Sequence, residues 1–542
     1  MPLARGANGA VASPHALATQ AGVAILRAGG SAVDAAIATN AALAVVAGYM
    51  CGLGGDAFWL IWDVEAGAAQ ALNGSGRSAG GATIEAAHAA GHAEMPLRGP
   101  WSITVPGAIR SWGDAHARYG RLPWPDLFAP AIELASGFPA SARWIASIEG
   151  GGLAYGVDGD WARSYRPEGR AWRPGERVRL PALESTLRML AADGPDTSYT
   201  GALAARAAAY LEASGSPLRA EDFAAHQSDW AAPISTTYRG VTSLSHPPNS
   251  CGPLALEMLN ILGSFPAPRR GAFTADGCTD AQWVHIGLEA ARIALAHRDA
   301  WLSDPAAMPA GALAQMLDPA FAAELARSIA LDHVTPPPPT TLPRGGGTIY
   351  LCTADRWGGL VSLIESNYSG FGSGLVDPET GIAYQNRGAF FRLDPAQVNA
   401  LAPRKRTVHT LTPGMLLRDG KPWIAHGAMG GEIQPQVFAQ FVSAVVDGGV
   451  DIATAVAAPR WAADNERHLG PLSLTKLESR IAPSVAERLR ALGHDVCITE
   501  AFDSAMGHEH AIEIVHDAVT GDAPPTLAAA ADPRSEGSAA AY

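Results

Sequence analysis

Three consecutive glycines precede Thr348, and this junction has the residues needed to break its own backbone. Gly345, Gly346 and Gly347 carry no Cβ, so the chain can bring the Thr348 hydroxyl close to the carbonyl carbon of Gly347. That approach permits an N→O acyl shift, followed by hydrolysis of the ester. The product is a threonine whose α-amine, with an ordinary pKa of about 7.7–8.0, can act as general base for its own hydroxyl. The junction predicts autocatalytic cleavage between Gly347 and Thr348, with Thr348 as nucleophile.

The same segment has a second interpretation, as a plain surface linker. Residues 335–347 contain prolines at 336–339 and 343 beside the glycines, a composition that forms neither a helix nor a central strand. Composition alone therefore indicates a connection between two halves of the chain. The choice between linker and cleavage site depends on what lies near Thr348 in space.

A second hydroxyl is expected beside Thr348. Residues 348–354 and 360–367 have strand composition and are joined by a glycine-containing turn. Pairing Asp355 with Leu360 places Thr348 opposite Asn367 and within one residue of Ser366. Ser366 can then hold the oxygen of the nucleophile or relay a proton. The alternative is an ordinary polar strand end.

Gly430 and Gly431 are candidates for an oxyanion hole. A hairpin is expected over 410–426, and a helix over 432–446. A glycine pair between a strand and a helix can point backbone N–H groups at a developing oxyanion, although a simple strand-to-helix turn has the same pattern.

The elements that position these residues begin with a helical hairpin. Ser13 is the expected N-cap of a helix over 16–27, which Gly29 and Gly30 end, and Ser31 caps a second helix that runs to about residue 46. The second helix is rich in alanine and carries Asp34, so it is expected to be buried in the protein and not to cross a membrane.

The rest of the chain alternates helical and strand patterns. Residues 57–63 and 68–72 are expected to pair as strands, 101–265 to be mostly helical, and 281–300 to form another helix. The tail 531–542 has no usable period. Helices combined with hairpins predict a layered fold of helices and sheets.

Composition and charge exclude several classes of partner. The formal net charge of −13 disfavours nucleic acid and anionic membranes. Five widely spaced cysteines form no CxxC pair, so we expect reduced thiols and neither a disulfide framework nor a zinc site. No basic start with an apolar run opens the sequence, so a cytoplasmic location is expected.

Two other motifs carry less weight. The run of His508, Glu509 and His510 contains metal-ligand residue types, but neighbours on a strand point to opposite faces, and we expect a solvated loop there. Gly52 to Gly55 resembles a phosphate loop, yet it precedes a strand, whereas a dinucleotide site needs its glycines after one. No metal site and no cofactor are predicted.

The sequence resembles the γ-glutamyltransferases, members of the N-terminal-nucleophile hydrolases. The matching residues lie in the family's order along most of the chain: Ala12 to Gly22, Gly29 to Ala36, Gly52 to Gly55, Val105 to Gly107, Phe371 to Gly374, and Gly430 and Gly431.

The resemblance implies an α+β fold, the four-layer αββα sandwich. It also implies a large subunit over 1–347 and a small subunit over 348–542, which remain together as a heterodimer or as a dimer of such heterodimers. Thr348 falls on the family's nucleophile, and Ser366 falls where the family has a second threonine that supports it. Gly430 and Gly431 fall on the oxyanion-hole glycines.

The departures from the family concern the substrate. Ser75 stands where the family has the arginine that binds the glutamyl α-carboxylate, and Phe390 where it has the aspartate that binds the α-amine. His409 and Thr410 replace a pair of serines. An unpaired ammonium beside a buried phenylalanine would cost several kcal/mol. Together with the segments 366–374, 385–388 and 532–534, these substitutions look more like the oxamate amidohydrolase branch, which implies a small substrate.

A carboxylated substrate still needs a cation or donors, and Arg387, Arg77 and His409 are the candidates. The predicted substrate-binding residues are Ser75, Arg77, Asn367, Tyr368, Arg387, Phe390, His409 and Thr410. The expected function is amide hydrolysis of a small carboxylated amide such as oxamate, through an acyl-threonine, with release of ammonia. The alternatives are a γ-glutamyltransferase or glutathione hydrolase, and an unprocessed, non-catalytic binding protein with the same fold.

Overall fold

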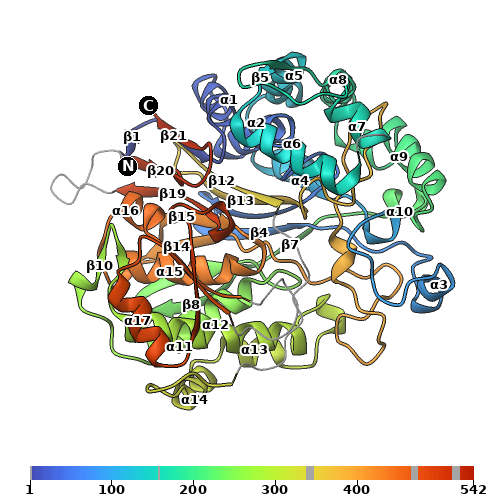
Figure 1. Cartoon of the computed structure of the whole chain (residues 1–542). Coiled ribbons are helices and arrows are strands. Elements are labelled where there is room, and N and C mark those ends of the chain that lie inside the picture. The colour runs from blue at the N-terminus through green and yellow to red at the C-terminus, as the bar shows by residue number, and fades with distance from the viewer. Residues whose placement is uncertain (1–2, 157–158, 337–346, 465–473, 516–524) are drawn as a thin grey trace.

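The structure is a computed structural model that describes residues 3–156, 159–336, 347–464, 474–515 and 525–542. Two seven-stranded sheets lie in the middle of the molecule, with helices on the outer side of each (Figure 1). The chain therefore has the α+β, four-layer αββα architecture that the resemblance implies. Most of the predicted linker, residues 337–346, lies outside the described residues.

The first sheet holds the predicted nucleophile. Its strands, in spatial order, are β21 (Ser538–Ala541), β2 (Gly9–Ser13), β12 (Gly347–Asp355), β13 (Leu360–Tyr368), β3 (Asp56–Asp63), β4 (Ala68–Gly74) and β7 (Asp229–Ala231). Each neighbouring pair is antiparallel. The strand that begins at the cleavage junction is therefore central, with partners on both sides.

The second sheet supplies the glycine pair. Its strands, in spatial order, are β1 (Ala4–Gly6), β20 (Thr526–Ala530), β19 (His508–Val515), β15 (Lys421–Met429), β14 (Gly414–Arg418), β9 (Val241–Ser245) and β8 (Ile234–Tyr238). Residues from before and after position 347 contribute to both sheets. A chain cut at this position would keep its two pieces joined through the sheets.

The core between the sheets follows from side-chain alternation along β12. Tyr350 and Cys352 point into a fully buried cluster shared with residues of the second sheet, such as Ala425 and Ile512. Ile349 and Leu351 point the other way, toward the helices. A strand covered on both faces needs a continuous apolar sequence, which β12 has.

Helices cover both outer faces. On the first sheet lie α1 (Ala16–Arg27), α2 (Ala32–Val46), α4 (Ala108–Tyr119), α5 (Ala129–Ser136) and α8 (Pro181–Asp193); on the second lie α11 (Gly252–Gly263), α12 (Ala281–Trp301) and α15 (Gln434–Val446). The remaining helices are α3 (Ile84–Ala89), α6 (Ala142–Tyr155), α7 (Asp160–Tyr165), α9 (Ala202–Ala213), α10 (Ala220–Ala224), α13 (Ala312–Leu317), α14 (Pro319–Ser328), α16 (Ile452–Ala457) and α17 (Pro483–Ala491). Among the residues described, none of the helices combines the length and apolar composition needed to cross a lipid bilayer.

Three small sheets complete the fold. They are β16 (Trp461–Asp464) with β17 (Leu474–Glu478) and β18 (Asp495–Thr499), β5 (Phe138–Pro139) with β6 (Arg177–Val178), and β10 (Phe273–Thr274) with β11 (Gly277–Cys278). The five cysteines are free thiols, three of them buried.

The two predicted N-terminal helices are confirmed, but one predicted cap is wrong. Ser31 caps α2 in a capping box, accepting from Asp34 N at 3.1 Å while Asp34 accepts from Ser31 N at 2.9 Å. The cap of α1 is His15, whose Nδ1 accepts from Leu17 N at 3.2 Å. Ser13 ends strand β2 and bonds to Thr19.

Two further expectations about elements are corrected. The predicted helical region 101–265 is interrupted before its last helix, α11, because 229–231, 234–238 and 241–245 are strands. The tail 531–542 is ordered into β21, which pairs with β2. Strand β21 pairs with a strand at the other end of the sequence, which local periodicity does not reveal, whereas 234–238 and 241–245 pair with each other as a local hairpin.

The hairpin of β12 and β13 forms as predicted, with a register one residue different. Leu360 pairs with Ala354, because Asp355 closes the turn: its Oδ1 accepts from Trp357 N and Gly359 N, both at 2.9 Å. Gly358 supplies the left-handed residue, at φ +93°. A bulge between Gly347 and Ile349 then changes the register again at the cleavage junction.

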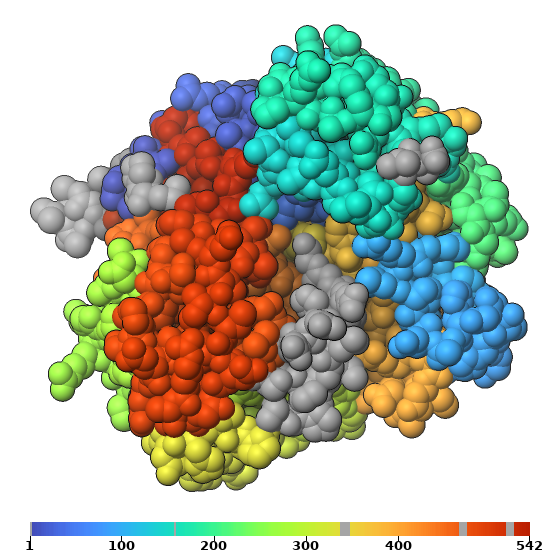
Figure 2. Space-filling view, viewed as in Figure 1, coloured from blue at the N-terminus to red at the C-terminus, as the bar shows by residue number. Residues whose placement is uncertain are grey.

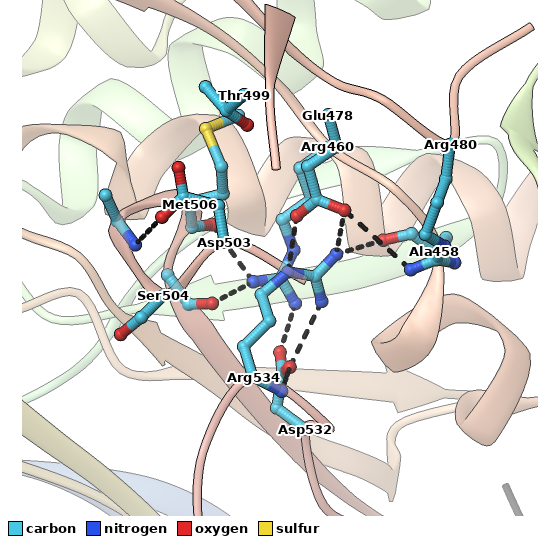
Figure 3. Close-up of polar contacts among 12 residues, drawn as sticks. Ala458, Arg460, Glu478, Arg480, Thr499, Asp503, Ser504, Met506, Asp532 and Arg534 are labelled. Carbon is cyan, nitrogen blue, oxygen red and sulfur yellow. Dashed lines mark hydrogen bonds and ion pairs between the residues drawn. The ribbon is translucent and has the colours of Figure 1, made fainter. Parts of the chain in front are cut away.

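A buried ion-pair network links the C-terminal segment to the three-stranded sheet of β16, β17 and β18 (Figure 3). Arg534 Nε lies 2.5 Å from Glu478 Oε1, and its Nη1 lies 3.1 Å from Asp532 Oδ1. Asp532 Oδ2 lies 2.5 Å from Arg460 Nη2. Burial opposes ionisation of Asp532, but Arg460 and Arg534 hold its pKa well below the ordinary value. Asp532 therefore stays charged at neutral pH.

Candidate active site

Thr348 and Ser366 lie side by side at the start of β12 and the end of β13. The Thr348 Oγ1 is 2.9 Å from Ser366 Oγ, and both residues are 1% exposed. Ser366 Oγ donates to Gly347 O at 2.7 Å and accepts from Tyr368 N at 2.7 Å. The sequence prediction that a second hydroxyl falls beside the nucleophile agrees with this geometry.

The hydrogen bonds around Ser366 fix the direction of each proton. A serine hydroxyl has one proton, and Ser366 gives it to the Gly347 carbonyl oxygen. The Thr348 hydroxyl must therefore donate to Ser366 Oγ. The arrangement is a short relay from the hydroxyl of Thr348 to the carbonyl of the bond that precedes it.

Gly430 and Gly431 follow directly after β15. Their φ angles are +144° and +58°, and residues 431–433 form one turn of 3₁₀ helix before α15. In the described part of the chain, no acceptor bonds to the N–H of Gly430 or Gly431. Met429 and Gly370 line the same cavity, and a Cβ on Gly347 would lie 2.7 Å from Gly370 N, so the end of β15 and the start of β12 are at one end of the sheets. Gly430 and Gly431 therefore lie at the same end of the sheets as Thr348, and their role as an oxyanion hole stays a prediction.

Arg387 is the buried cation of the site. Its Nη1 donates to Thr410 Oγ1 at 3.1 Å, and its Nη2 lies 3.4 Å from Ser366 Oγ. Burial lowers the pKa of Arg387 to about 10, so the group is charged at neutral pH. Among the described residues, no carboxylate oxygen lies within 4.0 Å of its guanidinium, although the side chain is only 1% exposed. A buried guanidinium of this kind lacks the anion that normally compensates it.

Aromatic rings hold the Arg387 guanidinium in place. Its central carbon lies 4.4 Å from the Tyr368 ring and 5.3 Å from the Phe390 ring. The turn 387–390 approaches the large-subunit backbone so closely that a Cβ on Gly388 would lie 2.8 Å from Ser102 O. Phe390 is therefore part of the wall beside the cation.

His409 faces Asp56 and not the nucleophile. Its Nε2 lies 3.2 Å from Asp56 Oδ2, and burial lowers the pKa of His409 well below its ordinary value, so we assign a neutral ring that donates from Nε2. Burial raises the pKa of Asp56 to about 7, although Gly76 N and Gly107 N both donate to its Oδ1 at 3.1 Å. Among the described residues His409 Nδ1 has no partner.

Glu365 is a second buried carboxyl that the sequence reasoning missed, as it missed Asp56. Glu365 precedes Ser366 and accepts from Asn40 Nδ2 at 2.6 Å and from Gly52 N at 2.9 Å. Burial raises its pKa to about 8. The available signal was an acidic residue within an otherwise apolar strand, because such a residue is rarely buried without partners.

Two other predicted substrate-binding residues, Ser75 and Asn367, contact other parts of the protein. Ser75 Oγ donates to Asn73 Oδ1 at 2.7 Å, in a buried network with Asn249. Asn367 points to the opposite face of β13 from Ser366, toward Gly52, and its amide atoms have no partner among the described residues.

Arg77 is held away from Arg387 by acidic partners. Its Nη1 lies 3.0 Å from Asp304 Oδ2 and its Nη2 3.7 Å from Asp229 Oδ2, with 40% of the side chain exposed. Of the three predicted receptors for a carboxylate, Arg387 alone combines a positive charge with contact to Ser366.

The two motifs set aside in the sequence have structural roles. A Cβ on Gly55 would lie 2.3 Å from Glu365 Oε1, so this glycine allows close packing against the carboxyl. The prediction of a solvated loop at 508–510 is wrong, because these residues form part of β19 and are buried. His508 bonds to Ser504, and His510 Nδ1 accepts from Asp532 N at 3.1 Å.

A group with metal-ligand residue types lies elsewhere, at His285, Glu289 and His494. Its atoms already bond within the protein: His285 Nδ1 contacts His494 Nε2 at 2.8 Å, and His285 Nε2 contacts Ala330 O at 2.7 Å. Glu289 Oε2 accepts from Thr335 N at 3.2 Å. These contacts explain the cluster as a link that holds the segment before position 336.

The two stacked sheets between helices define the fold class as that of the N-terminal-nucleophile hydrolases. A solved structure of cephalosporin acylase from Bacillus halodurans superposes with a TM-score of 0.90 at 36% identity, covering 100% of this chain and 97% of that one. The sequence profile described as Gamma-glutamyltranspeptidase matches residues 18–542. The chain therefore belongs to the γ-glutamyltranspeptidase family.

Two relatives cover almost the whole chain. The chain is 39% identical over 544 residues to the oxamate amidohydrolase proenzyme of Klebsiella pneumoniae, covering 99% of this chain and 98% of that protein. It is 38% identical over 534 residues to the glutathione hydrolase-like YwrD proenzyme of Bacillus subtilis, covering 98% and 97%. At the family level, the chain is an amide-bond hydrolase or γ-glutamyl-transferring enzyme whose relatives are proenzymes.

Proposed function

We propose that this protein is an autocatalytically processed amidohydrolase that cleaves a small carboxylated amide such as oxamate and releases ammonia. The observation that carries the proposal is Arg387, a charged and buried guanidinium that has no carboxylate partner in the described part of the chain and lies 3.4 Å from Ser366 Oγ. A substrate carboxylate would compensate this charge through paired hydrogen bonds. The similarity to the oxamate amidohydrolase proenzyme supports the same substrate class.

Maturation begins at the relay between Thr348 and Ser366. The Thr348 Oγ attacks the Gly347 carbonyl carbon; its proton passes to Ser366, and the proton of Ser366 passes to the Gly347 oxygen. Collapse breaks the bond between the Gly347 carbon and the Thr348 nitrogen, which takes up a proton and becomes an amine. Water then hydrolyses the ester and leaves a carboxylate on Gly347 and a free N-terminal Thr348. Subunits 1–347 and 348–542 stay together as a heterodimer.

Catalysis in the mature protein uses the new amine. The amine takes the Oγ proton as Oγ forms a bond to the amide carbon, and the N–H groups of Gly430 and Gly431 bind the oxyanion. The carbon–nitrogen bond then breaks, and the amine returns the proton to the departing ammonia. Water, activated by the same amine, hydrolyses the acyl-threonine ester. Each step needs only groups of this chain, the substrate and water.

The alternative within enzymes is a γ-glutamyl hydrolase or transferase, which the relative in Bacillus subtilis favours by its description. A γ-glutamyl group carries an α-ammonium as well as an α-carboxylate. Phe390 offers no charge to an ammonium and lies in the wall beside Arg387, so an ammonium there would meet a cation instead of an anion. This electrostatic argument favours the carboxylated amide.

The test is a comparison of substrates on one preparation of matured protein. Oxamate is assayed by ammonia release beside a chromogenic γ-glutamyl anilide. We expect a kcat/KM for oxamate well above that for the anilide. A higher kcat/KM for the anilide would replace the proposal by γ-glutamyl chemistry. A protein that hydrolyses neither substrate, whether cleaved or uncleaved, would favour the non-catalytic binding protein.

A further inference from the structure

A cavity of about 260 Å³ adjoins the candidate active site and is lined from both future subunits. Residues 1–347 contribute Arg98, Arg143 and Tyr155, and residues 348–542 contribute Met429 and Ser504. In Figure 2, the teal surface of the region around α6 faces the red surface of the C-terminal region across a hollow. We call this space the Arg98/Arg143 cavity.

Two residues in the wall of the Arg98/Arg143 cavity neighbour residues of the candidate active site. Met429, in its wall, directly precedes the oxyanion-hole candidate Gly430. Gly370, also in its wall, is the residue against which Gly347 packs. Tyr155 Oη donates to Gly370 O at 2.5 Å and so fixes this part of the wall. A molecule held in the cavity can therefore reach toward the atoms that surround Thr348.

The Arg98/Arg143 cavity is cationic. Arg143 donates to two neutral acceptors, Ser504 Oγ at 2.7 Å and Arg534 O at 2.6 Å. Arg98 donates to Ala154 O at 3.1 Å and lies over the Tyr155 ring. Among the described residues, no carboxylate oxygen lies within 4.0 Å of either guanidinium.

Glu536 contacts the backbone of Arg143 but does not pair with its guanidinium. Glu536 accepts from the backbone N of Arg143 at 3.3 Å and from Ser141 Oγ at 2.6 Å, outside ion-pair distance of the Arg143 guanidinium. The chain as a whole carries a formal charge of −13. Two arginines without acidic partners in one cavity are therefore suited to an anion from outside the protein.

We propose that the Arg98/Arg143 cavity binds an anionic group on the amine side of the substrate amide. Arg387 already receives the carboxylate on the acyl side, so a second anion falls on the part that leaves as the amine. The substrate class is then an N-acylated amino acid with a carboxylated acyl group, which releases an amino acid where oxamate releases ammonia. This inference rests on the proposed function, because Arg387 is assigned there.

The test uses two amides that differ only on the amine side. N-oxalylglycine carries a carboxylate there and N-methyloxamate carries none, and both release oxalate. We expect matured wild-type protein to favour N-oxalylglycine in kcat/KM by about fivefold, the scale of partly exposed ion pairs. The ratio should fall to near one in R98Q and in R98Q/R143Q. R188Q, which removes an exposed arginine on α8 that pairs with Glu184, should keep the wild-type ratio.

The outcomes separate this inference from the proposed function. A wild-type ratio of one or less, or a ratio unchanged in R98Q and R98Q/R143Q, would overturn the inference. If oxalyl amides are inert, the proposed function fails, and the ratio of γ-glutamylglycine to γ-glutamylmethylamide then decides the inference in the same variants. Matured protein that hydrolyses neither series contradicts both.

Discussion

The Thr348 hydroxyl donates to Ser366 across 2.9 Å, and Ser366 in turn donates to the carbonyl oxygen of Gly347. This pair connects the attacking oxygen with the oxygen of the bond under attack. In the proposed mechanism, one serine serves both maturation, by moving a proton, and catalysis, by holding the freed Thr348 hydroxyl.

Replacing Ser366 with alanine should slow self-cleavage by about 100-fold, the lower end of what a positioned proton-transfer group contributes. The rate is followed on a denaturing gel from the time of synthesis. Ser366→Thr keeps the hydroxyl and should mature within about threefold of the wild-type rate. Equal maturation of the alanine and threonine variants would contradict the relay.

Replacing Arg387 with glutamine should lower kcat/KM for oxamate by about 30-fold or more, because a buried charged contact to the carboxylate is lost. Arg387→Lys keeps the charge but loses the paired hydrogen bonds, so its kcat/KM should lie between those of the wild type and Arg387→Gln. The discriminating variant is Arg77→Gln, since Arg77 is bound by Asp304 and Asp229. A larger loss of kcat/KM with Arg77→Gln than with Arg387→Gln would show that Arg77, and not Arg387, binds the carboxylate.

Asp56 and Glu365 should make the folded chain less stable as pH rises. Their pKa values are near 3.8 and 4.5 in the absence of the fold, and about 7 and 8 within it. Between about pH 4 and pH 8 the folded state holds more protons than the unfolded state, so the free energy of unfolding falls as pH increases, by up to about 1.4 kcal/mol per pH unit and proton.

The measurement is urea denaturation of the uncleaved Thr348→Ala chain at pH 5 and pH 7.5. Glu365→Gln and Asp56→Asn in that background should each reduce the loss of stability between the two pH values. A pH dependence that both variants leave intact would show that neither carboxyl retains its proton in the folded chain.

The Arg534 network should be a major source of stability for the C-terminal segment. Arg534→Ala leaves Glu478 and Asp532 buried with less compensation, which typically costs about 3–5 kcal/mol. Arg188→Ala removes an exposed ion pair and should change stability by less than about 1 kcal/mol. Thermal unfolding of both variants in the uncleaved background makes the comparison, and equal shifts would contradict the role of the network.

The sequence predicts the neighbourhood of Thr348 well because a hairpin turns local spacing into spatial proximity. Ser366 falls beside Thr348 even though the predicted register is one residue off, since the bulge at Gly347 changes the pairing at that end. The glycine pair 430–431 follows its predicted strand for the same local reason.

Local spacing does not predict contacts between segments that are distant in the sequence. Asp56 meets His409, and Glu365 meets Asn40, only after the strands and helices assemble. The strands 234–238 and 241–245 pair with each other as a hairpin, and their place in the second sheet depends on contact between 241–245 and the distant β14. The choice of Arg387 over Arg77 also needed the fold, because both are arginines with no distinguishing local pattern.

The most direct test of self-cleavage is intact mass spectrometry of freshly purified protein, combined with N-terminal sequencing of the smaller piece. The account predicts two polypeptides, residues 1–347 and 348–542, with threonine at the start of the second, and a single uncut chain for Thr348→Ala. An active wild-type protein of one uncut polypeptide, or a cut at the same bond in Thr348→Ala, would contradict it.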